Sequence, residues 1–374
     1  MKKAAFYIKG IIKNNAVTFI ALFAATVTSF FVPPDKNYID YFDFKTLTCL
    51  FCVLAVVCAL RNVRFFYTLA QKIVKRFKNA RMAIIGLVYI TFIGSMLIAN
   101  DMALLTFLPL GYYVLHTTKK KKYLAFTFIM QNIAANLGGM LTPFGNPQNL
   151  YLYSKFNIPD LEFMGIMLFP FLLSITLITV CCVIFVKPEP LELEATHYNT
   201  PKGRVAFYLL LFALSIVIVF RVIPYWIGPA VIVPALLIID RRALLNVDYG
   251  LLLTFVFFFI FSGNLARIEA VKIFISSLLE KNTLLVSVIS CQFISNVPSA
   301  ILLSQFTDNY KALLFGVNIG GAGTLIASLA SLITFREYIT EEPKKVGSYI
   351  LKFSAFNFGF LIILTLFCSL LLAL

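Results

Sequence analysis

Long apolar runs alternate along the chain with short polar segments that are rich in lysine and arginine. Several runs reach the roughly 17–25 residues that a helix needs to cross a bilayer. The uninterrupted runs predict spans over residues 15–32, 45–60, 161–186, 205–220, 224–239, 250–266 and 347–372. With two interrupted helices added, we expect an all-α polytopic membrane protein with about nine full crossings.

The basic residues predict which loops face the cytoplasm, because cytoplasmic loops carry an excess of lysine and arginine. The N-terminal segment carries Lys2, Lys3, Lys9 and Lys13, so we place the N-terminus in the cytoplasm. The acidic segment 33–43 suits the opposite side. No small-residue cleavage site follows the first apolar run, which favours a retained span over a signal peptide. The expected location is the cytoplasmic (inner) membrane, with multiple passes.

Two segments consist of apolar arms around a short polar turn, and each predicts a re-entrant helical hairpin. Residues 82–116 turn at Asn100-Asp101, and basic residues flank both ends, so both ends should be cytoplasmic. Residues 283–307 turn at residues 295–298, and both ends should lie outside. Basic residues interleaved with apolar ones at helical spacing predict an amphipathic surface helix before each hairpin, at 61–81 and 267–282.

A broken helix follows each hairpin. The sequence TPFGNPQN at 142–149 interrupts an apolar stretch with two prolines and a glycine, which cannot continue a regular helix. Irregular backbone at membrane depth is tolerated where it is buried in protein or lines a cavity. We therefore expect one broken helix over 123–153 and a second over 311–334.

The two broken helices share a motif. Residues 136–142 read NLGGMLT and 318–324 read NIGGAGT, so both fit N-x-G-G-x-x-T. This predicts two repeats, at 1–186 and 223–374, separated by a cytoplasmic loop and an extra span at 187–222. The extra span would invert the second repeat, and inverted repeats place a binding site between them at the membrane midplane.

Composition excludes several classes of function. Apolar residues make up 60% of the 374 positions and charged residues 13%, and the mean hydropathy is +0.89, too apolar for a soluble domain. The net charge of +15 resides in short loops between spans, so we expect no nucleic-acid partner. The seven cysteines lie in apolar segments and should be inert thiols. His116 and His197 are far apart, so we expect neither a histidine metal site nor an enzyme, which would need a nucleophile–base pair or a metal cluster.

Polar residues near the predicted midplane are the candidate site. Asp101 has two readings, as an N-cap for the second hairpin arm or as a cation or proton site. The amides of Asn146, Gln148 and Asn149 cost free energy there unless they bind something, whereas the paired glycines could serve only close helix packing. Four helix N-termini should converge at the centre and favour an anion. No lysine or arginine lies near the tips in sequence, so we expect a weakly charged substrate or a co-bound cation.

These motifs, together with the tips AND (99–101) and SNVP (295–298) and the stretch NIGGAGTLIASLASL (318–332), resemble the ion transporter superfamily. This group includes citrate and dicarboxylate carriers, arsenite permeases and a branch of sodium/proton antiporters. Dicarboxylate carriers usually show Ser-Asn-Thr at both tips, so the Asn-Asp tip looks more like the arsenite-permease and anion-permease branch.

The resemblance implies an elevator-type carrier, usually a homodimer, with a cation site at each hairpin tip and substrate between them. The substrate-binding residues it implies are Asn146, Pro147, Asn149, Asn296, Thr324 and Ser328. The residues it implies for cation or proton coupling are Asn100, Asp101, Asn136, Gly138, Asn318 and Gly320. No metal is expected beyond Na⁺ at the tips.

The sequence thus predicts a secondary active transporter of a small anion, coupled to H⁺ or Na⁺. The alternative is a Na⁺/H⁺ antiporter of the same superfamily, and a passive channel agrees less well with inverted repeats. We expect no cofactor besides the coupling ion. The expected partners are a small anionic or weakly charged solute, membrane lipid and a second copy of the chain.

Overall fold

The computed structural model describes residues 16–191 and 201–373, and every regular element in those ranges is helical. The elements of the first part are α2 (Ala16–Phe31), η1 (Lys36–Tyr41), α3 (Phe44–Asn62), α4 (Phe65–Val74), α5 (Ala80–Ile98), α6 (Asn100–Thr117), η2 (Lys121–Tyr123), α7 (Leu124–Gly138), η3 (Gly139–Leu141), α8 (Pro147–Lys155) and α9 (Asp160–Phe185). Those of the second part are α10 (Lys202–Val219), α11 (Ile227–Ile239), α12 (Arg241–Leu245), α13 (Tyr249–Ala266), α14 (Glu269–Ile294), α15 (Asn296–Leu303), α16 (Tyr310–Ile319), α17 (Leu329–Glu341), η4 (Pro343–Lys345) and α18 (Val346–Ala373). Residues 1–15, which carry the basic N-terminal segment, lie outside the described ranges.

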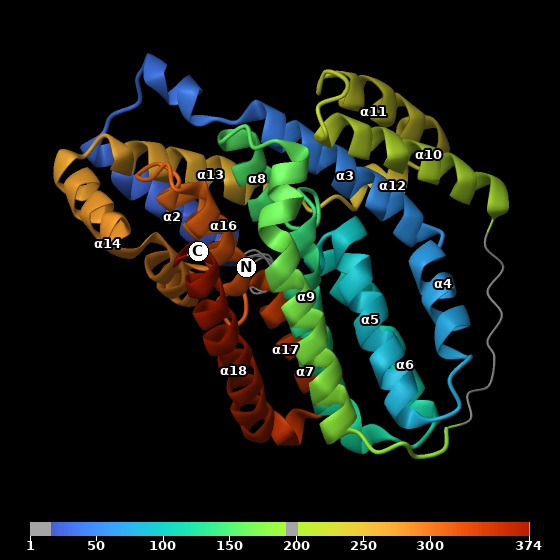
Figure 1. Cartoon of the computed structure of the whole chain (residues 1–374). Helices are drawn as coiled ribbons and strands as arrows, with labels where there is room; N and C mark the ends of the chain where they lie inside the picture. Colours follow the sequence, from blue (N-terminus) through green and yellow to red (C-terminus); the bar gives the residue numbers. More distant parts are fainter. Residues whose placement is uncertain (1–15, 192–200, 374) are drawn as a thin grey trace, which may run out of the picture.

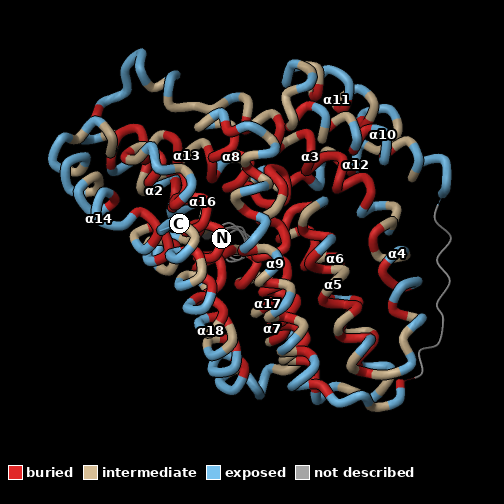
Figure 2. The backbone as a smooth tube through the Cα atoms, viewed as in Figure 1, coloured by how far each residue is buried: buried red, intermediate tan, exposed pale blue. Residues whose placement is uncertain are grey.

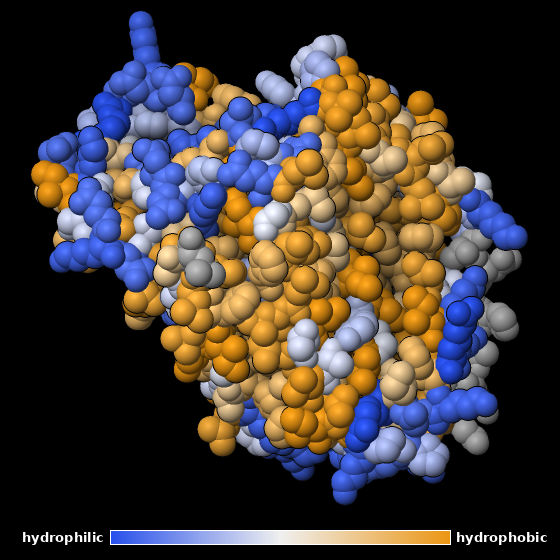
Figure 3. All heavy atoms as spheres, viewed as in Figure 1, coloured by the Kyte–Doolittle hydropathy of each residue, from blue (hydrophilic) through white to orange (hydrophobic). Residues whose placement is uncertain are grey.

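The surface of this helical assembly is that of a membrane protein. In the described part of the chain, 8 helices are long and apolar enough to cross a bilayer, and 2 shorter apolar helices accompany them. Figure 3 shows a broad apolar band between hydrophilic surfaces at opposite ends of the molecule. The predicted all-α polytopic class is therefore confirmed.

The predicted span at 224–239 is shorter than expected. Its helix, α11, has only 13 residues because a turn containing Pro224 precedes it and the Asp240 side chain caps the next helix. The count of nine full crossings stays a prediction.

Both predicted hairpins form helix-turn-helix units. The first is α5 and α6, within two residues of the predicted 82–116, and the second is the end of α14 with α15. The first turn lies one residue earlier than predicted. Ala99 makes it with a positive φ of 65°, and Asn100 and Asp101 already belong to α6.

One surface segment differs from its prediction and the other agrees with it. The helix expected over 61–81 is the shorter α4, and a separate connection leads from it to α5. The helix expected over 267–282 is the first part of α14, and it ends where predicted, at a kink at Asn282 (φ −164°, ψ 90°), after which α14 continues as the first arm of the hairpin. The side chain of Asn282 caps the second part by accepting from the amide of Leu285 at 2.9 Å.

The broken helices interlock with the hairpins. α7 ends at Gly138 and resumes as α8 at Pro147, and α16 ends at Ile319 and resumes as α17 at Leu329. α7 packs on α5 and α6, whereas α17 packs on α6 and α7 and α8 packs on α15 and α16. The second part of each broken helix therefore contacts the hairpin of the other half (Figure 1).

Two groups of helices flank this centre. α2 packs on α13, and α3 packs on α10 and α11. The most continuously buried segments are the middle of α3 and the broken helix α7–α8, as Figure 2 shows. The irregular backbone between α7 and α8 is accordingly enclosed by protein, as polar backbone at membrane depth requires.

Candidate functional site

The two hairpin tips have the same local geometry. Ala99 (φ 65°, ψ 151°) and Ser295 (φ 74°, ψ 160°) make the turns, and an asparagine follows each. The Asn100 Oδ1 accepts a hydrogen bond from the Asp101 amide at 2.9 Å, and the Asn296 Oδ1 accepts one from the Val297 amide at 2.9 Å. Each tip asparagine thereby satisfies one of the otherwise unpaired N–H groups at a helix start.

This geometry contradicts the N-cap reading of Asp101. The N-cap position of α6 is Ala99, no side chain caps it, and the Asp101 side chain lies inside the first turn. The Oδ1 atom of Asp101 is buried and has no hydrogen-bond partner among the described residues. The carboxylate is therefore available to a ligand.

A second matched contact joins each tip to its broken helix. The hydroxyl of Thr142 donates to the carbonyl of Met96 at 2.8 Å, and that of Thr324 donates to the carbonyl of Gln292 at 3.0 Å. The two threonines hold the same position in N-x-G-G-x-x-T, and each acceptor lies three residues before its turn. The shared motif thus makes the same contact in both halves.

Asparagine side chains connect the two broken helices to each other. The Nδ2 of Asn318 donates to the Oδ1 of Asn149 at 2.6 Å, and the Nδ2 of Asn146 donates to the Oδ1 of Asn318 at 3.3 Å. The amide of Asn149 also donates to the carbonyls of Gly139, Met140 and Thr142, at 3.2 to 3.4 Å. These amides organise the irregular backbone, and the Oδ1 of Asn146 remains buried without a partner among the described residues.

The glycines of the motif allow close approach. A Cβ atom on Gly138 would collide with the carbonyl of Phe92 in α5, and one on Gly320 would lie 2.8 Å from the sulfur of Cys291 in α14. A Cβ on Gly321 would lie 3.0 Å from the Nδ2 of Asn296. Gly323 has a φ of 144°, which only glycine adopts readily, and this turn lets Gln292 donate to the carbonyl of Gly320 at 2.9 Å.

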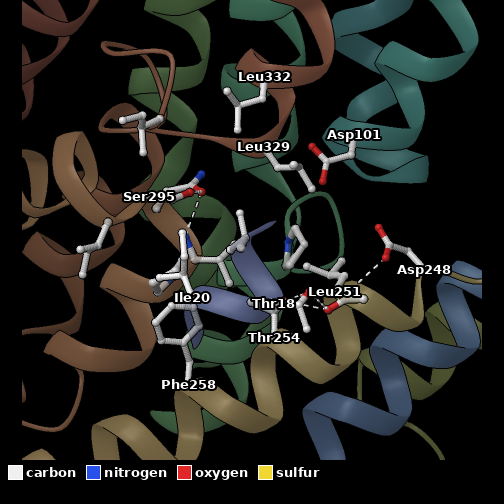
Figure 4. Close-up of a pocket in the computed structure, with 18 of the residues that line it drawn as sticks. Thr18, Ile20, Asp101, Asp248, Leu251, Thr254, Phe258, Ser295, Leu329 and Leu332 are labelled. Carbon is white, nitrogen blue, oxygen red and sulfur yellow. Dashed lines mark hydrogen bonds between the residues drawn. The ribbon is translucent and has the colours of Figure 1, made fainter. Parts of the chain in front are cut away.

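A cavity of about 340 Å³ lies where these elements meet. Its wall includes the starts of α6, α8, α15 and α17, at Asn100, Pro147, Asn296 and Leu329 (Figure 4). α2 and α13 complete the wall, held together where the hydroxyl of Thr18 donates to the carbonyl of Gly250 at 3.0 Å. Four helix N-termini bring their positive dipole ends to one volume, as the sequence predicted, and such ends favour an anion.

Three charged residues line the same cavity. Asp101 belongs to the first turn of α6, Asp248 precedes α13, and Arg336 lies on α17. Figure 4 shows Asp101 and Asp248 on the same side of the cavity, on different elements. No lysine or arginine lies near the tips in sequence, but α17 continues to Glu341 instead of ending at residue 334, and its Arg336 lines the same cavity.

The residues implied by the resemblance fall into two groups. Those that line the cavity are Asn100, Asp101, Pro147 and Asn296. Those that do not line it are Asn136, Gly138, Asn146, Asn149, Asn318, Gly320, Thr324 and Ser328. Within the second group, the Oδ1 of Asn136 accepts from the Nδ2 of Asn100 at 3.4 Å and so helps to position a residue of the first group. Ser328 caps α17, whose first residue, Leu329, lines the cavity.

Sequence reasoning missed several residues of the site. Asp248 and Arg336 appeared to belong to cytoplasmic loops, and Gln292 is a single amide within an apolar arm. Gln292 could have been found by its place three residues before a tip, because it is a polar side chain within an otherwise apolar arm. Thr18 and Thr254, whose hydroxyls lie 2.8 Å apart on the cavity wall, gave no signal in the sequence.

A comparison with known families places these features in context. The sequence model of the citrate transporter family matches residues 5–312. This chain belongs to the citrate transporter family.

Relatives of the chain agree with membership in this family of membrane transporters. An uncharacterized transporter of Methanocaldococcus jannaschii is 34% identical over 317 residues, which cover 83% of this chain and 84% of the relative. The inner membrane protein YbiR of Escherichia coli is 30% identical over 322 residues, which cover 82% and 84%. A multi-pass membrane transporter of the citrate transporter type is therefore established, within the ion transporter superfamily whose motifs the chain resembles.

Proposed function

We propose that the protein is a secondary active transporter that carries a small anion across the cytoplasmic membrane, coupled to H⁺ or Na⁺. The observation that carries this proposal is the cavity in which four helix N-termini converge beside the carboxylate of Asp101. The N-termini supply a positive potential for the anion, and the carboxylate supplies a site for the cation. Substrate and coupling ion would then neutralise each other within one cavity.

Asp101 is the proposed coupling residue. Its Oδ1 is buried without a partner among the described residues, which is costly for a carboxylate unless a proton or a metal cation joins it. The second tip has Val297 at the equivalent position, so coupling at the two tips would be unequal. The side-chain amides of Asn100 and Asn296 each accept a hydrogen bond within their own hairpin tip. They would thereby fix the geometry of both sites.

The anion itself would be small. A volume of about 340 Å³ is at the lower end of the range for small-molecule sites. The family name makes citrate the first candidate, and Arg336 on the wall adds a positive charge to the cavity. The two carboxylates in the same wall disfavour a highly charged anion that arrives without cations.

Alternating access of the elevator type is the proposed mechanism. The two hairpins and the two broken helices interlock and would move together, whereas α2 with α13 and α3 with α10 and α11 would form the scaffold. The matched tip geometry and the matched threonine contacts support the predicted inverted repeat, which this mechanism uses. The scaffold would also provide the surface for a homodimer.

The cavity would face the cytoplasm in the present conformation. Asp248 follows the basic residues Arg241 and Arg242, and Arg336 precedes the basic segment at Lys344. Both lie on the side that the positive-inside rule assigns to the cytoplasm, and both line the cavity together with the hairpin tips.

The experiment is uptake by proteoliposomes that contain the purified full chain. Citrate, succinate, phosphate and arsenite are offered in turn, with an imposed Na⁺ gradient, an imposed proton gradient or neither. The proposal predicts that one solute accumulates only when one of the gradients is present. If every solute enters at the rate of protein-free liposomes under all three conditions, while the protein exchanges other ions, the proposal is wrong.

A Na⁺/H⁺ antiporter is the second candidate. The specific observation in its favour is the pair of acidic residues in the cavity, because Asp101 and Asp248 could exchange Na⁺ and H⁺ without an anion. The same proteoliposomes decide between the two. An inward Na⁺ gradient that drives proton efflux with no solute present would establish the antiporter.

A further inference from the structure

A groove at the periphery, separate from the central cavity, lies between α4 and α10. Its volume is about 260 Å³, and four residues from each helix line it. The residues from α4 are Phe65, Thr68, Leu69 and Lys72, and those from α10 are Lys202, Val205, Ala206 and Leu209. α4 packs on α3, α5 and α6, so the face of α4 that carries these four residues borders the groove.

The chemistry of the groove repeats on its two sides. On each helix the four residues are spaced i, i+3, i+4 and i+7, which is one face of an α-helix. Each face provides one lysine, and the other three side chains are apolar or small. Lys72 and Lys202 are both exposed and form no ion pair with any residue that the structure describes.

The position of the groove limits what can occupy it. α10 is one of the apolar helices long enough to cross a bilayer, and Lys202 lies at its first turn. α4 exposes Leu69 and Ile73 beside Lys72, so one helix presents an apolar and a basic surface together (Figure 3 shows hydrophilic residues at this edge of the apolar band). Lysine near the end of an apolar helix reaches the level of the lipid headgroups.

We propose that this groove binds an anionic phospholipid. Its acyl chain would contact Phe65, Leu69 and Leu209, and its phosphate would pair with the amines of Lys72 and Lys202. Both parts are needed, because a zwitterionic lipid offers the chains without a net charge, and a free phosphate offers the charge without the chains. The bound lipid would fill the space between the two helices, of which α4 leads to the first hairpin and α10 belongs to the peripheral helices.

The test is native mass spectrometry of the full chain, released from nanodiscs that contain equal amounts of phosphatidylglycerol and phosphatidylcholine with identical acyl chains. The wild type should retain phosphatidylglycerol preferentially. Each basic side chain near an anionic surface contributes roughly a fivefold preference. The double variant Lys72→Gln/Lys202→Gln should therefore lose a preference of roughly 25-fold, and high salt should weaken that of the wild type.

Two further variants separate headgroup recognition from total charge. Lys272→Gln/Lys281→Gln removes the same charge from exposed positions on α14 and should leave the preference unchanged. Ala206→Trp fills the groove while both lysines remain, and it should lower retention of either lipid. Equal retention of the two lipids by the wild type would overturn the proposal. An equal loss of preference in the two double variants would also overturn it, because the charge of the whole surface would then explain the binding.

Discussion

At the scale of single residues, Asn318 connects the two halves of the site. It donates to the side chain of Asn149 at 2.6 Å and accepts from the side chain of Asn146 at 3.3 Å, and all three residues are almost fully buried. Water cannot replace these partners at such burial. The loss of one hydrogen bond would therefore leave a buried polar atom unpaired, which is costly.

Replacement of Asn318 by alanine should destabilise the protein by on the order of 2 kcal/mol, because it leaves the Oδ1 of Asn149 without its donor. The seven cysteines are unpaired, six of them buried and Cys181 half-buried, so a thiol-reactive dye reports thermal unfolding. The melting temperature of Asn318→Ala should fall by several degrees. Asn37→Ala, at an exposed position, is the control. An unchanged melting temperature for Asn318→Ala would show that the network does not hold the broken helices together.

The residue scale also shows what the sequence could and could not reveal. Asn100, Asp101, Pro147 and Asn296 were found because polar residues and proline stand out in an apolar segment, and all four line the cavity. Asp248 and Arg336 were missed because they belong to segments that read as loops, and only the length of α17 and the approach of α13 bring them to the cavity. Such positions depend on tertiary packing, which has no local pattern.

At the scale of elements, Arg221 joins the α10–α11 connection to the end of α8. Its guanidinium donates to the Oδ1 of Asn157 at 2.6 Å and to the carbonyl of Tyr153, and it stacks on the Tyr153 ring with 3.9 Å to the centroid. Arg221 belongs to the proposed scaffold, whereas Asn157 and Tyr153 belong to the proposed moving group, and the contact lies on the side predicted to face outside. This contact would close the outer side of the site.

Arg221→Ala should therefore increase the population of the outward-open conformation, on the order of tenfold for a partly exposed, charge-assisted contact. The readout is labelling of a cysteine introduced at Val297, on the cavity wall, by a membrane-impermeant thiol reagent applied outside. Arg267→Ala, which breaks an ion pair with Asp35 on the same predicted side, is the control. Equal labelling rates for the two variants would contradict the proposed closure.

A second contact between elements fixes the segment after α9 to the base of the first hairpin. The Glu189 carboxylate accepts from Lys120 at 2.7 Å, from Lys122 and from Tyr123, and its carbonyl accepts from the Ala80 amide at 2.7 Å. The Leu191 amide donates to the carbonyl of Lys78 at 2.9 Å. The hydrogen bonds from the two lysines and the tyrosine lower the pKa of Glu189 to about 2.

The lowered pKa gives this contact a defined pH dependence. A carboxyl group whose folded pKa lies below its unfolded value stabilises the fold above the unfolded value, and the contribution is lost as the pH falls toward the folded value. The contact should thus be complete at neutral pH and weaken between about pH 4.5 and about pH 2. At neutral pH, Glu189→Gln should accelerate hydrogen exchange of the Ala80 and Leu191 amides, whereas Glu269→Gln, at an exposed position of α14, should not. Unchanged exchange at both amides would show that the side chain does not hold this segment.

Most elements could be predicted from the sequence, and the differences have physical causes. Runs of apolar residues located the spans, and proline with glycine located the breaks after Gly138 and Ile319, because these residues act locally on the backbone. The predicted boundary between residues 282 and 283 coincides with the kink at Asn282. The short α11 was predicted less well, because the Asp240 side chain that caps the next helix leaves no mark in the hydrophobic periodicity.

At the scale of the whole molecule, the arrangement explains why the site has to be at the centre. Each broken helix crosses to the hairpin of the other half, so four helix starts meet in one cavity, and α2, α13 and the end of α14 also line it. Neither half could form this cavity alone. The matched contacts of Thr142 and Thr324 show that the same motif builds both sides, whereas Asp101 and Val297 make the sides chemically different.

The central claim is that this cavity couples a cation to an anion through Asp101. The most direct measurement compares gradient-driven uptake of the transported anion by proteoliposomes of the wild type, Asp101→Asn and Asp308→Asn, the last being an exposed acidic residue away from the cavity. The account predicts accumulation against the concentration gradient by the wild type and by Asp308→Asn. Asp101→Asn should accumulate the anion at least about tenfold less than the wild type, because its amide cannot take up a proton and carries no charge to hold Na⁺. Accumulation by Asp101→Asn equal to that of the wild type would contradict the account.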